Sequence, residues 1–220
     1  MKVKAVVIDM DGTITKFNLD YMAARRRALD ELEKLGLRTP DMTDQVNLFV
    51  ILQELKNKCK PEEFSKLRST FYEFFEEMEL KSAEDVTVYP GAEKTLQELH
   101  AKRLKIGLVT NNSRKGTELT LKRHHLAPFF DAVVTRDDCD EMKPASAPIM
   151  KILGELGVST ESAILVGDGV MDIMAAKAAG LISVAVATGP FPIQRVLKAE
   201  PDYVLSSVNE LPLLIELLEK

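Results

Sequence analysis

The sequence has little of what secreted or membrane proteins use. Its 220 residues include two cysteines, Cys59 and Cys139, so no disulfide framework is expected and a reducing cytoplasm is the compartment that fits. The first apolar run, residues 5–8, ends at Asp9 and is too short for a signal peptide. The longest uncharged stretch, residues 178–194, is broken by glycine and proline and falls short of a spanning helix. A cytoplasmic protein without a membrane partner is predicted.

An excess of basic residues is also lacking. The chain has 29 lysines and arginines against 34 acidic residues, for a net charge of −5, and nucleic acid as the main partner would call for a basic surface. Hydrophobic residues make up 45% and charged residues 29%, which is typical of globular chains and excludes wholesale disorder. The length suits one α/β domain with a substantial insertion.

Short, mostly apolar runs rich in β-branched residues recur along the chain. Continuous apolarity is typical of strands buried on both faces of a parallel sheet. Runs of helical length lie between them, and this alternation predicts a doubly wound (Rossmann-like) parallel sheet of the α/β class. The expected strands are Val3–Ile8, Leu104–Val109, Ala132–Thr135, Ala163–Val166 and Ile182–Ala187, with Tyr203–Leu205 as an edge strand. The helices expected between them are Ala92–Arg103, Arg114–His124, Ala147–Leu156 and Met171–Ala179, and a last helix is expected after Ser207, with Leu211, Leu214 and Leu218 on one stripe.

One long segment interrupts this alternation directly after the first strand. Between about residues 14 and 88 there is no convincing strand, but three apolar stripes follow one another at helical spacing. Gly36 is placed to end the first helix, and Pro61 suits the first turn of the third. The segment therefore predicts a small helical bundle with its own core over residues 15–87, inserted into a core of residues 1–14 and 88–220.

Two carboxylates stand at the end of the first expected strand. Asp9 and Asp11 are followed by Gly12, which permits a tight bend, so both can reach one cavity at the edge where open α/β sheets bind ligands. They would repel each other unless a cation lay between them or one held a proton, and hard oxygen ligands favour Mg²⁺. On its own, the same pattern is also a common turn signal.

Further polar residues follow the other strands. Thr110 and Asn111 end the second strand before a helix, where free amides favour an anion, although an ordinary helix cap fits as well. Lys143 follows the third strand and could balance phosphate and carboxylate charge, or could be a solvated lysine. Asp168 ends the fourth strand, where it could be a metal ligand or cap the following helix, and Asp172 lies four residues later on that helix. If none of these residues were functional, four separate structural explanations, as turn, helix caps and solvated lysine, would all have to apply at one edge of the sheet.

These motifs together resemble the haloacid dehalogenase-like phosphohydrolase superfamily. The sequence carries the four motifs in order, as Asp9-x-Asp11-Gly12-Thr13, Thr110-Asn111, Lys143-Pro144 and Gly167-Asp168-x-x-x-Asp172. The run Tyr89-Pro90-Gly91-Ala92 is similar to the phosphoglycolate phosphatase and β-phosphoglucomutase branch. The resemblance covers essentially the whole predicted core.

The resemblance implies the chemistry of the two strand-end acids. Asp9 would be the nucleophile that forms an aspartyl phosphate, and Asp11 would protonate the leaving alcohol and then activate water. An aspartate at position 11 distinguishes phosphatases and phosphomutases from dehalogenases and transport ATPases. The expected activity is Mg²⁺-dependent hydrolysis of a small phosphate monoester, with phosphoglycolate or a sugar phosphate as candidates. A phosphomutase and an aspartate-phosphorylated regulatory protein are the alternatives.

The resemblance also implies ligands for the metal and the phosphate. Mg²⁺ would be held mainly by Asp9 and Asp168, with the backbone carbonyl of Asp11, and with Asp172 as a ligand or a support. Lys143 would be a catalytic residue as well as a phosphate ligand. The phosphoryl oxygens would be held by Thr110, Asn111 and Lys143.

By the same resemblance, the helical insertion is a cap that closes over the site, and the residues just past Thr13 contact the substrate. Lys16 and Phe17 lie there, and Lys16 stands where many relatives carry an acid, so it either meets an acidic substrate or is solvated. Residues 25–27 are three arginines, each about 100° further around a helix, so they cannot all face one cleft.

Overall fold

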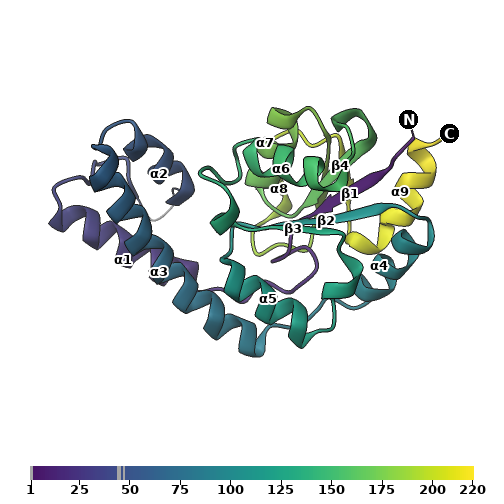
Figure 1. The fold of residues 1–220 in the computed structure, drawn as a ribbon, viewed down its shortest axis with the longest axis horizontal. Coiled ribbons are helices and arrows are strands. Elements are labelled where there is room, and N and C mark those ends of the chain that lie inside the picture. The colour runs from purple at the N-terminus through teal and green to yellow at the C-terminus, as the bar shows by residue number, and fades with distance from the viewer. Residues whose placement is uncertain (1, 44–45, 47) are drawn as a thin grey trace.

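The computed structural model describes residues 2–43, 46 and 48–220, and these form a sheet domain and a helical insertion (Figure 1). The sheet has six strands, all parallel, in the order β3-β2-β1-β4-β5-β6. The chain adds β2 and β3 on one side of β1 and then β4, β5 and β6 on the other, and this reversal of the strand order confirms the predicted doubly wound fold. The strands are β1 (Ala5–Ile8), β2 (Lys105–Val109), β3 (Ala132–Val134), β4 (Ala163–Gly167), β5 (Ile182–Val186) and β6 (Tyr203–Leu205).

Helices cover both faces of the sheet. One face packs against α4, α5 and α9, and the other against α6, α7 and α8, in two main apolar cores and a small third one (Figure 1). The short α8 is the one sheet-domain helix, among the described residues, that the apolar pattern did not predict. These helices are α4 (Ala92–Ala101), α5 (Arg114–Arg123), α6 (Ala147–Leu156), α7 (Val170–Ala179), α8 (Ile193–Leu197) and α9 (Leu211–Leu218).

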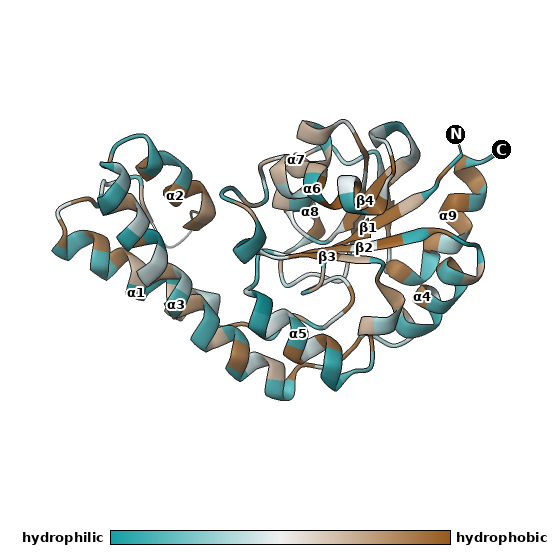
Figure 2. Cartoon of the chain, in the orientation of Figure 1, coloured by the Kyte–Doolittle hydropathy of each residue, from teal (hydrophilic) through white to brown (hydrophobic). Residues whose placement is uncertain are grey.

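Hydropathy follows burial in the central strands. Strands β1 and β4 are apolar along their whole length (Figure 2), whereas α9 is apolar even on its exposed side, at Leu213 and Leu217. The first strand is shorter than predicted, since regular pairing begins at Ala5, but Val3 is nonetheless buried in the core. Within the described ranges, no helix combines the length and the apolar character needed to cross a bilayer.

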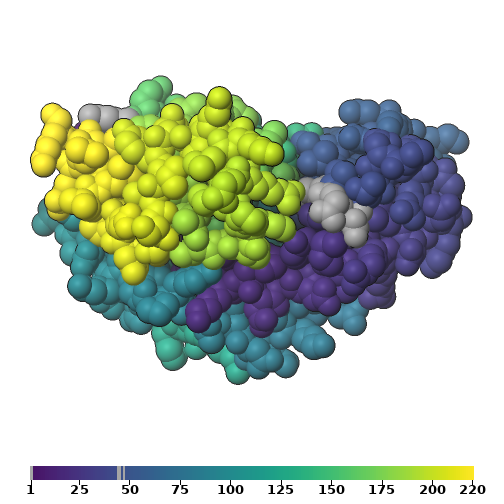
Figure 3. Space-filling view, turned by 180° about the vertical axis from the view of Figure 1, so that it is seen from behind, coloured from purple at the N-terminus to yellow at the C-terminus, as the bar shows by residue number. Residues whose placement is uncertain are grey.

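Three helices form the insertion after β1, namely α1 (Tyr21–Lys34), α2 (Leu48–Lys56) and α3 (Pro61–Asp85). They share an apolar core separate from those of the sheet, as the three stripes predicted. Figure 3 shows the insertion and the C-terminal part of the chain as two lobes with a notch between them. The predicted boundaries between the core (residues 1–14 and 88–220) and the insertion (residues 15–87) stay a prediction. Residues 1, 44, 45 and 47, which belong to these predicted parts, lie outside the described residues.

Helix α3 connects the two parts. Its N-terminal part, up to Phe75, carries Leu67, Phe71 and Phe75 into the core of the insertion, and the helix also packs along α5 of the sheet domain. The exposed ion pair between Glu76 and Lys115 joins the two helices at 2.7 Å. This continuity of one 25-residue helix means that the position of the insertion and the position of α5 depend on each other.

Candidate active site

The site lies at the point where the strand order reverses. Asp9 directly follows β1 and Asp168 directly follows β4, and these two strands are neighbours in parallel register. Because the carboxyl ends of both strands open on the same edge, ligands of such sheets bind there. The topology therefore brings together two acids that are separated by more than 150 positions in the chain.

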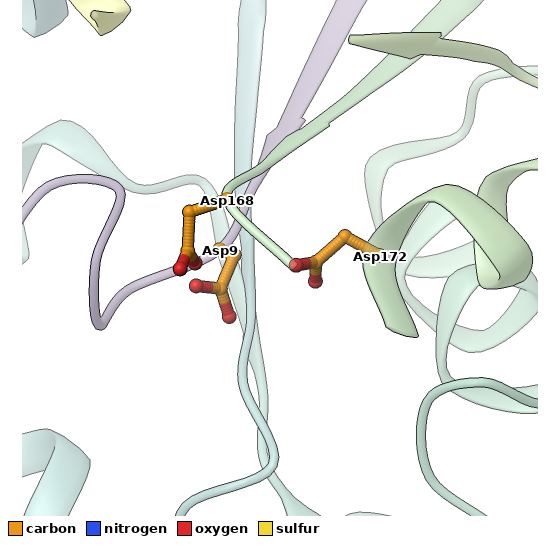
Figure 4. Close-up of side chains that lie close together, drawn as sticks. All are labelled: Asp9, Asp168 and Asp172. Atoms are coloured by element: carbon orange, nitrogen blue, oxygen red, sulfur yellow. The ribbon is translucent and has the colours of Figure 1, made fainter. Parts of the chain in front are cut away.

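Three carboxylates converge at this edge. Asp9, Asp168 and Asp172 each offer an oxygen, and these oxygens lie within 4.8 Å of one another. Figure 4 shows Asp9 between the other two side chains, with Asp172 contributed by α7. The hydroxyl of Thr13 donates weakly to Asp9 at 3.3 Å and to Asp168 at 3.4 Å. The predicted gathering of acids is thus present in the structure.

Glycines leave room for Asp168. Gly12 has a φ of +87°, and a Cβ built on it would lie 2.4 Å from an oxygen of Asp168. A Cβ on Gly189, in the loop after β5, would lie 2.1 Å from the same oxygen. Both contacts are shorter than any side chain tolerates, so glycine is required at both positions to keep this carboxylate where it is.

Lys143 is buried between two of the acids. Its Nζ lies 2.6 Å from an oxygen of Asp9 and 2.6 Å from an oxygen of Asp172, and it also donates to the carbonyl of Val109 at 3.0 Å. The side chain is only 3% exposed, so the solvated alternative considered for this lysine is wrong. The second oxygen of Asp172 accepts a hydrogen bond from the backbone of Gly169.

Burial dominates the electrostatics of the cluster. It raises the pKa of Asp9 to about 7, against the opposing charge of Lys143 and together with the nearby charge of Asp172. Burial, followed by the charges of Asp9 and Asp172, raises the pKa of Asp168 well above its usual range. For Lys143 burial lowers the pKa, but Asp172 and Asp9 outweigh this and hold it above its ordinary value. One lysine therefore does not offset three crowded carboxylates.

This donor set fits Mg²⁺. Three carboxylate oxygens within reach of one another are hard ligands, and their mutual repulsion would be relieved by a divalent cation. Asp9, Asp168 and Asp172 are the residues that would hold it. The side chain of Asp11 does not belong to this cluster, and its predicted contribution through the backbone carbonyl stays a prediction.

Asp11 is instead held by two hydrogen bonds. Thr15 donates to one carboxylate oxygen at 2.9 Å, and the side-chain amide of Asn112 donates to the other at 2.5 Å. Burial raises the pKa of Asp11 to about 6, although both hydrogen bonds act to lower it. Asn112 did not appear among the predicted site residues, and its position next to Asn111 was the only sequence signal for it.

The loop after β2 links the predicted phosphate-binding residues. Asn111 donates its side-chain amide to the carbonyl of Lys143 at 2.9 Å, so the two loops are joined. The side-chain oxygen of Asn111, Oδ1, is buried and has no hydrogen-bond partner in the described part of the chain. Thr110 is buried, and its hydroxyl accepts from the backbone of Asn112 at 3.2 Å. Their contact with phosphate stays a prediction.

A cavity of about 160 Å³ lies between the insertion and this loop. Phe17 lines it, whereas Lys16 is exposed and does not, and contact of either residue with the substrate stays a prediction. Of the three successive arginines, Arg25 alone is buried, at 9% exposure, and it lines the cavity with its guanidinium 4.8 Å from the ring centre of Tyr21. The other lining residues are Leu19, Tyr21, Leu48, Phe49, Phe75, Met78, Glu79, Asn111, Asn112 and Phe191.

A second, larger cavity of about 590 Å³ lies elsewhere, between α3 and residues 136–140. None of the predicted catalytic, metal or phosphate residues lines it. Volume alone therefore does not locate the reaction, and the smaller cavity next to Asn111 and Asn112 is the candidate for the substrate.

With the fold and the acidic site in place, comparison with known proteins defines the class as a hydrolase of the α/β type. A family model described as haloacid dehalogenase-like hydrolase matches residues 6–186. The chain belongs to the haloacid dehalogenase-like hydrolase family, as the four motifs predicted. It is 31% identical over 210 residues to pyrophosphatase PpaX of Bacillus velezensis, covering 96% of this chain and 95% of the relative. Pyrophosphatase PpaX of Bacillus mycoides is 30% identical over 213 residues, covering 96% of each chain.

Solved structures confirm the fold. A predicted phosphatase from Clostridium acetobutylicum superimposes with a TM-score of 0.70 at 22% identity, over 100% of both chains. A predicted phosphoglycolate phosphatase from Haemophilus somnus superimposes with a TM-score of 0.65 at 20% identity, over 97% of this chain and 98% of that one. At such identities the likeness concerns the fold alone.

Proposed function

We propose that this protein is a Mg²⁺-dependent phosphatase that acts on a small phosphorylated compound through an aspartyl phosphate, an acyl phosphate formed on Asp9. The observation that carries the proposal is the position of Asp9, which lies at the strand end between two further carboxylates and in contact with Lys143. A carboxylate held among potential cation ligands can approach an anionic phosphate, because the surrounding positive charge offsets the repulsion.

In the first step, a carboxylate oxygen of Asp9 attacks phosphorus, and the bond from phosphorus to the leaving oxygen breaks. Asp11 gives a proton to that oxygen. In the second step, Asp11 takes a proton from water, whose oxygen attacks phosphorus and releases inorganic phosphate and the free carboxylate of Asp9. Bound Mg²⁺ would supply positive charge that neutralises the phosphoryl oxygens.

The remaining residues orient and shield the reacting groups. Lys143 fixes the carboxylate of Asp9 through a 2.6 Å contact and adds positive charge beside it. Thr110 and Asn111 lie on the neighbouring loop, at the start of α5, where amides attract phosphoryl oxygens. The insertion covers the loop from the other side and would exclude water during the transfer.

The cavity favours a small, strongly anionic substrate. Its volume of about 160 Å³ is below the roughly 300–1,000 Å³ of pockets for drug-sized ligands. Arg25 offers a positive charge on the wall formed by the insertion, and this suits a second anionic group. Phosphoglycolate and small sugar phosphates remain candidates, and the names of the Bacillus relatives add inorganic pyrophosphate, which is hydrolysed by the same steps.

Removal of divalent metal is expected to abolish phosphate release. With p-nitrophenyl phosphate as a general substrate, activity should fall to background in EDTA and return when Mg²⁺ is added in excess, because the three carboxylates otherwise repel the phosphate. Release of phosphate at the same rate in EDTA would contradict the metal requirement. Conversion of a sugar phosphate into its isomer without phosphate release would favour the phosphomutase alternative.

Arg25→Gln is expected to weaken binding of substrates that carry a second anionic group. The lost charge-assisted hydrogen bond corresponds to roughly 1.5–3 kcal/mol, so KM for pyrophosphate or phosphoglycolate should rise by about 10-fold to 100-fold with a smaller change in kcat. Arg26→Gln, at the exposed neighbouring position, is the matched control. An equal effect of both variants, or none on KM in Arg25→Gln, would remove Arg25 from the substrate site.

A further inference from the structure

A buried ion pair lies outside the set of residues that the reaction uses directly. Glu79 of α3 and Arg136, in the loop after β3, are 4% and 1% exposed, and their side chains are in direct contact. Taking two charges out of water is costly, so such a pair is weak evidence of stabilisation by itself. Its other hydrogen bonds indicate what it does.

The pair binds three consecutive backbone positions of the loop that follows β2. A guanidinium nitrogen of Arg136 donates to the carbonyl of Asn111 at 3.2 Å, and the backbone N–H of Arg136 donates to the carbonyl of Asn112 at 3.0 Å. The second oxygen of Glu79 accepts from the backbone N–H of Ser113 at 2.9 Å. The peptide units on both sides of Asn112 are thereby fixed.

Asn112 is one of the two residues, with Thr15, that hold the carboxylate of Asp11. Its side-chain amide donates to the carboxylate at 2.5 Å, so any rotation of the loop would withdraw this donor. The ion pair is also tied to α3 at a second point, since Arg136 donates to the carbonyl of Tyr72 at 3.0 Å. One hydrogen-bonded path therefore leads from the helix that carries the insertion to the predicted proton donor.

We propose that Glu79 and Arg136 are a positioning pair for the reaction, which hold Asn112 against Asp11 and so keep the proton donor directed at the leaving oxygen. This inference rests on the proposed function of Asp11. Glu79 also lines the candidate substrate cavity, but the role proposed for the pair is to hold the backbone of residues 111–113. Because both partners contact α3, the orientation of Asp11 depends on how the insertion is seated on the sheet domain.

The inference is tested by comparing a leaving group that needs a proton with one that does not. Phenyl phosphate releases a basic phenolate, whereas p-nitrophenyl phosphate releases a stable one. Glu79→Gln and Asn112→Ala should each reduce kcat/KM for phenyl phosphate by about 100-fold, within the range contributed by general acid catalysis, and for p-nitrophenyl phosphate by less than about 10-fold. In the double variant the two losses should not multiply.

Glu76→Gln is the matched control, since Glu76 lies on the same helix and pairs with Lys115 of α5 at the surface. It should leave both substrates unaffected. Equal losses on both substrates in folded Glu79→Gln and Asn112→Ala would show a structural role only and overturn the inference. If Glu79→Gln does not fold, Asn112→Ala decides, because that side chain is half-buried and outside the ion pair. If the unmodified protein hydrolyses neither ester, the proposed function fails and the inference fails with it.

Discussion

Asp9→Asn is expected to lower turnover by on the order of 10⁴-fold or more, the scale of loss when a covalent nucleophile is removed. The amide cannot form the acyl phosphate, and the substitution also removes one of the three carboxylates that would hold the cation. Phosphate release under saturating substrate and Mg²⁺ measures the effect.

The fold should survive this substitution. Lys143 keeps its contact with Asp172 at 2.6 Å, and Asp168 loses a repelling neighbour, so the substitution does not strand the buried lysine and relieves repulsion at Asp168. Circular dichroism and thermal melting should therefore match the unmodified protein closely. Asp140→Asn, at an exposed aspartate that pairs with Arg68, is the control and should keep full activity. Turnover near normal in Asp9→Asn would remove Asp9 from the nucleophile role.

Lys143→Met has the second largest expected effect, and it is on stability as well as rate. The methionine fills the space but leaves Asp9 and Asp172 buried together without a cation. Removing one partner of a buried ion pair costs about 3–5 kcal/mol, which lowers Tm by roughly 6–20 °C for a chain of this size. Thermal melting in EDTA measures it.

A second substitution separates lost charge balance from lost packing. Adding Asp172→Asn to Lys143→Met removes one of the two stranded carboxylates, so part of the lost Tm should return. Lys151→Met, at an exposed lysine 3.7 Å from Glu155, should change Tm little. A Tm for Lys143→Met equal to that of Lys151→Met would mean that Lys143 does not balance the buried acids.

The parts of the site that follow strand ends could be predicted from the sequence. A parallel sheet brings the carboxyl ends of its strands to one edge, so Asp9 and Asp168 had to lie near each other once the strands were recognised. Lys143 was less certain, because the loop that carries it has no regular structure. Its burial between Asp9 and Asp172 became visible only in the folded chain.

The residues that hold the site in place could not be predicted in this way. Glu79 and Arg136 are 57 positions apart and belong to different parts of the fold, and neither follows a strand directly. One signal was present, since Glu79 continues the stripe of Phe71 and Phe75 at a spacing of four, where an acid is unusual. Helical spacing likewise predicted that Arg25–Arg27 diverge, but which arginine faces inward depended on how α1 packs.

The central claim, that phosphate is transferred to Asp9, is tested most directly by mass spectrometry of the acid-quenched enzyme during turnover of p-nitrophenyl phosphate with Mg²⁺. The account predicts one added phosphate on the peptide that contains Asp9, sensitive to hydroxylamine as an acyl phosphate is, and absent from Asp9→Asn. Efficient turnover with phosphate on no aspartate, or on a different residue, would contradict it.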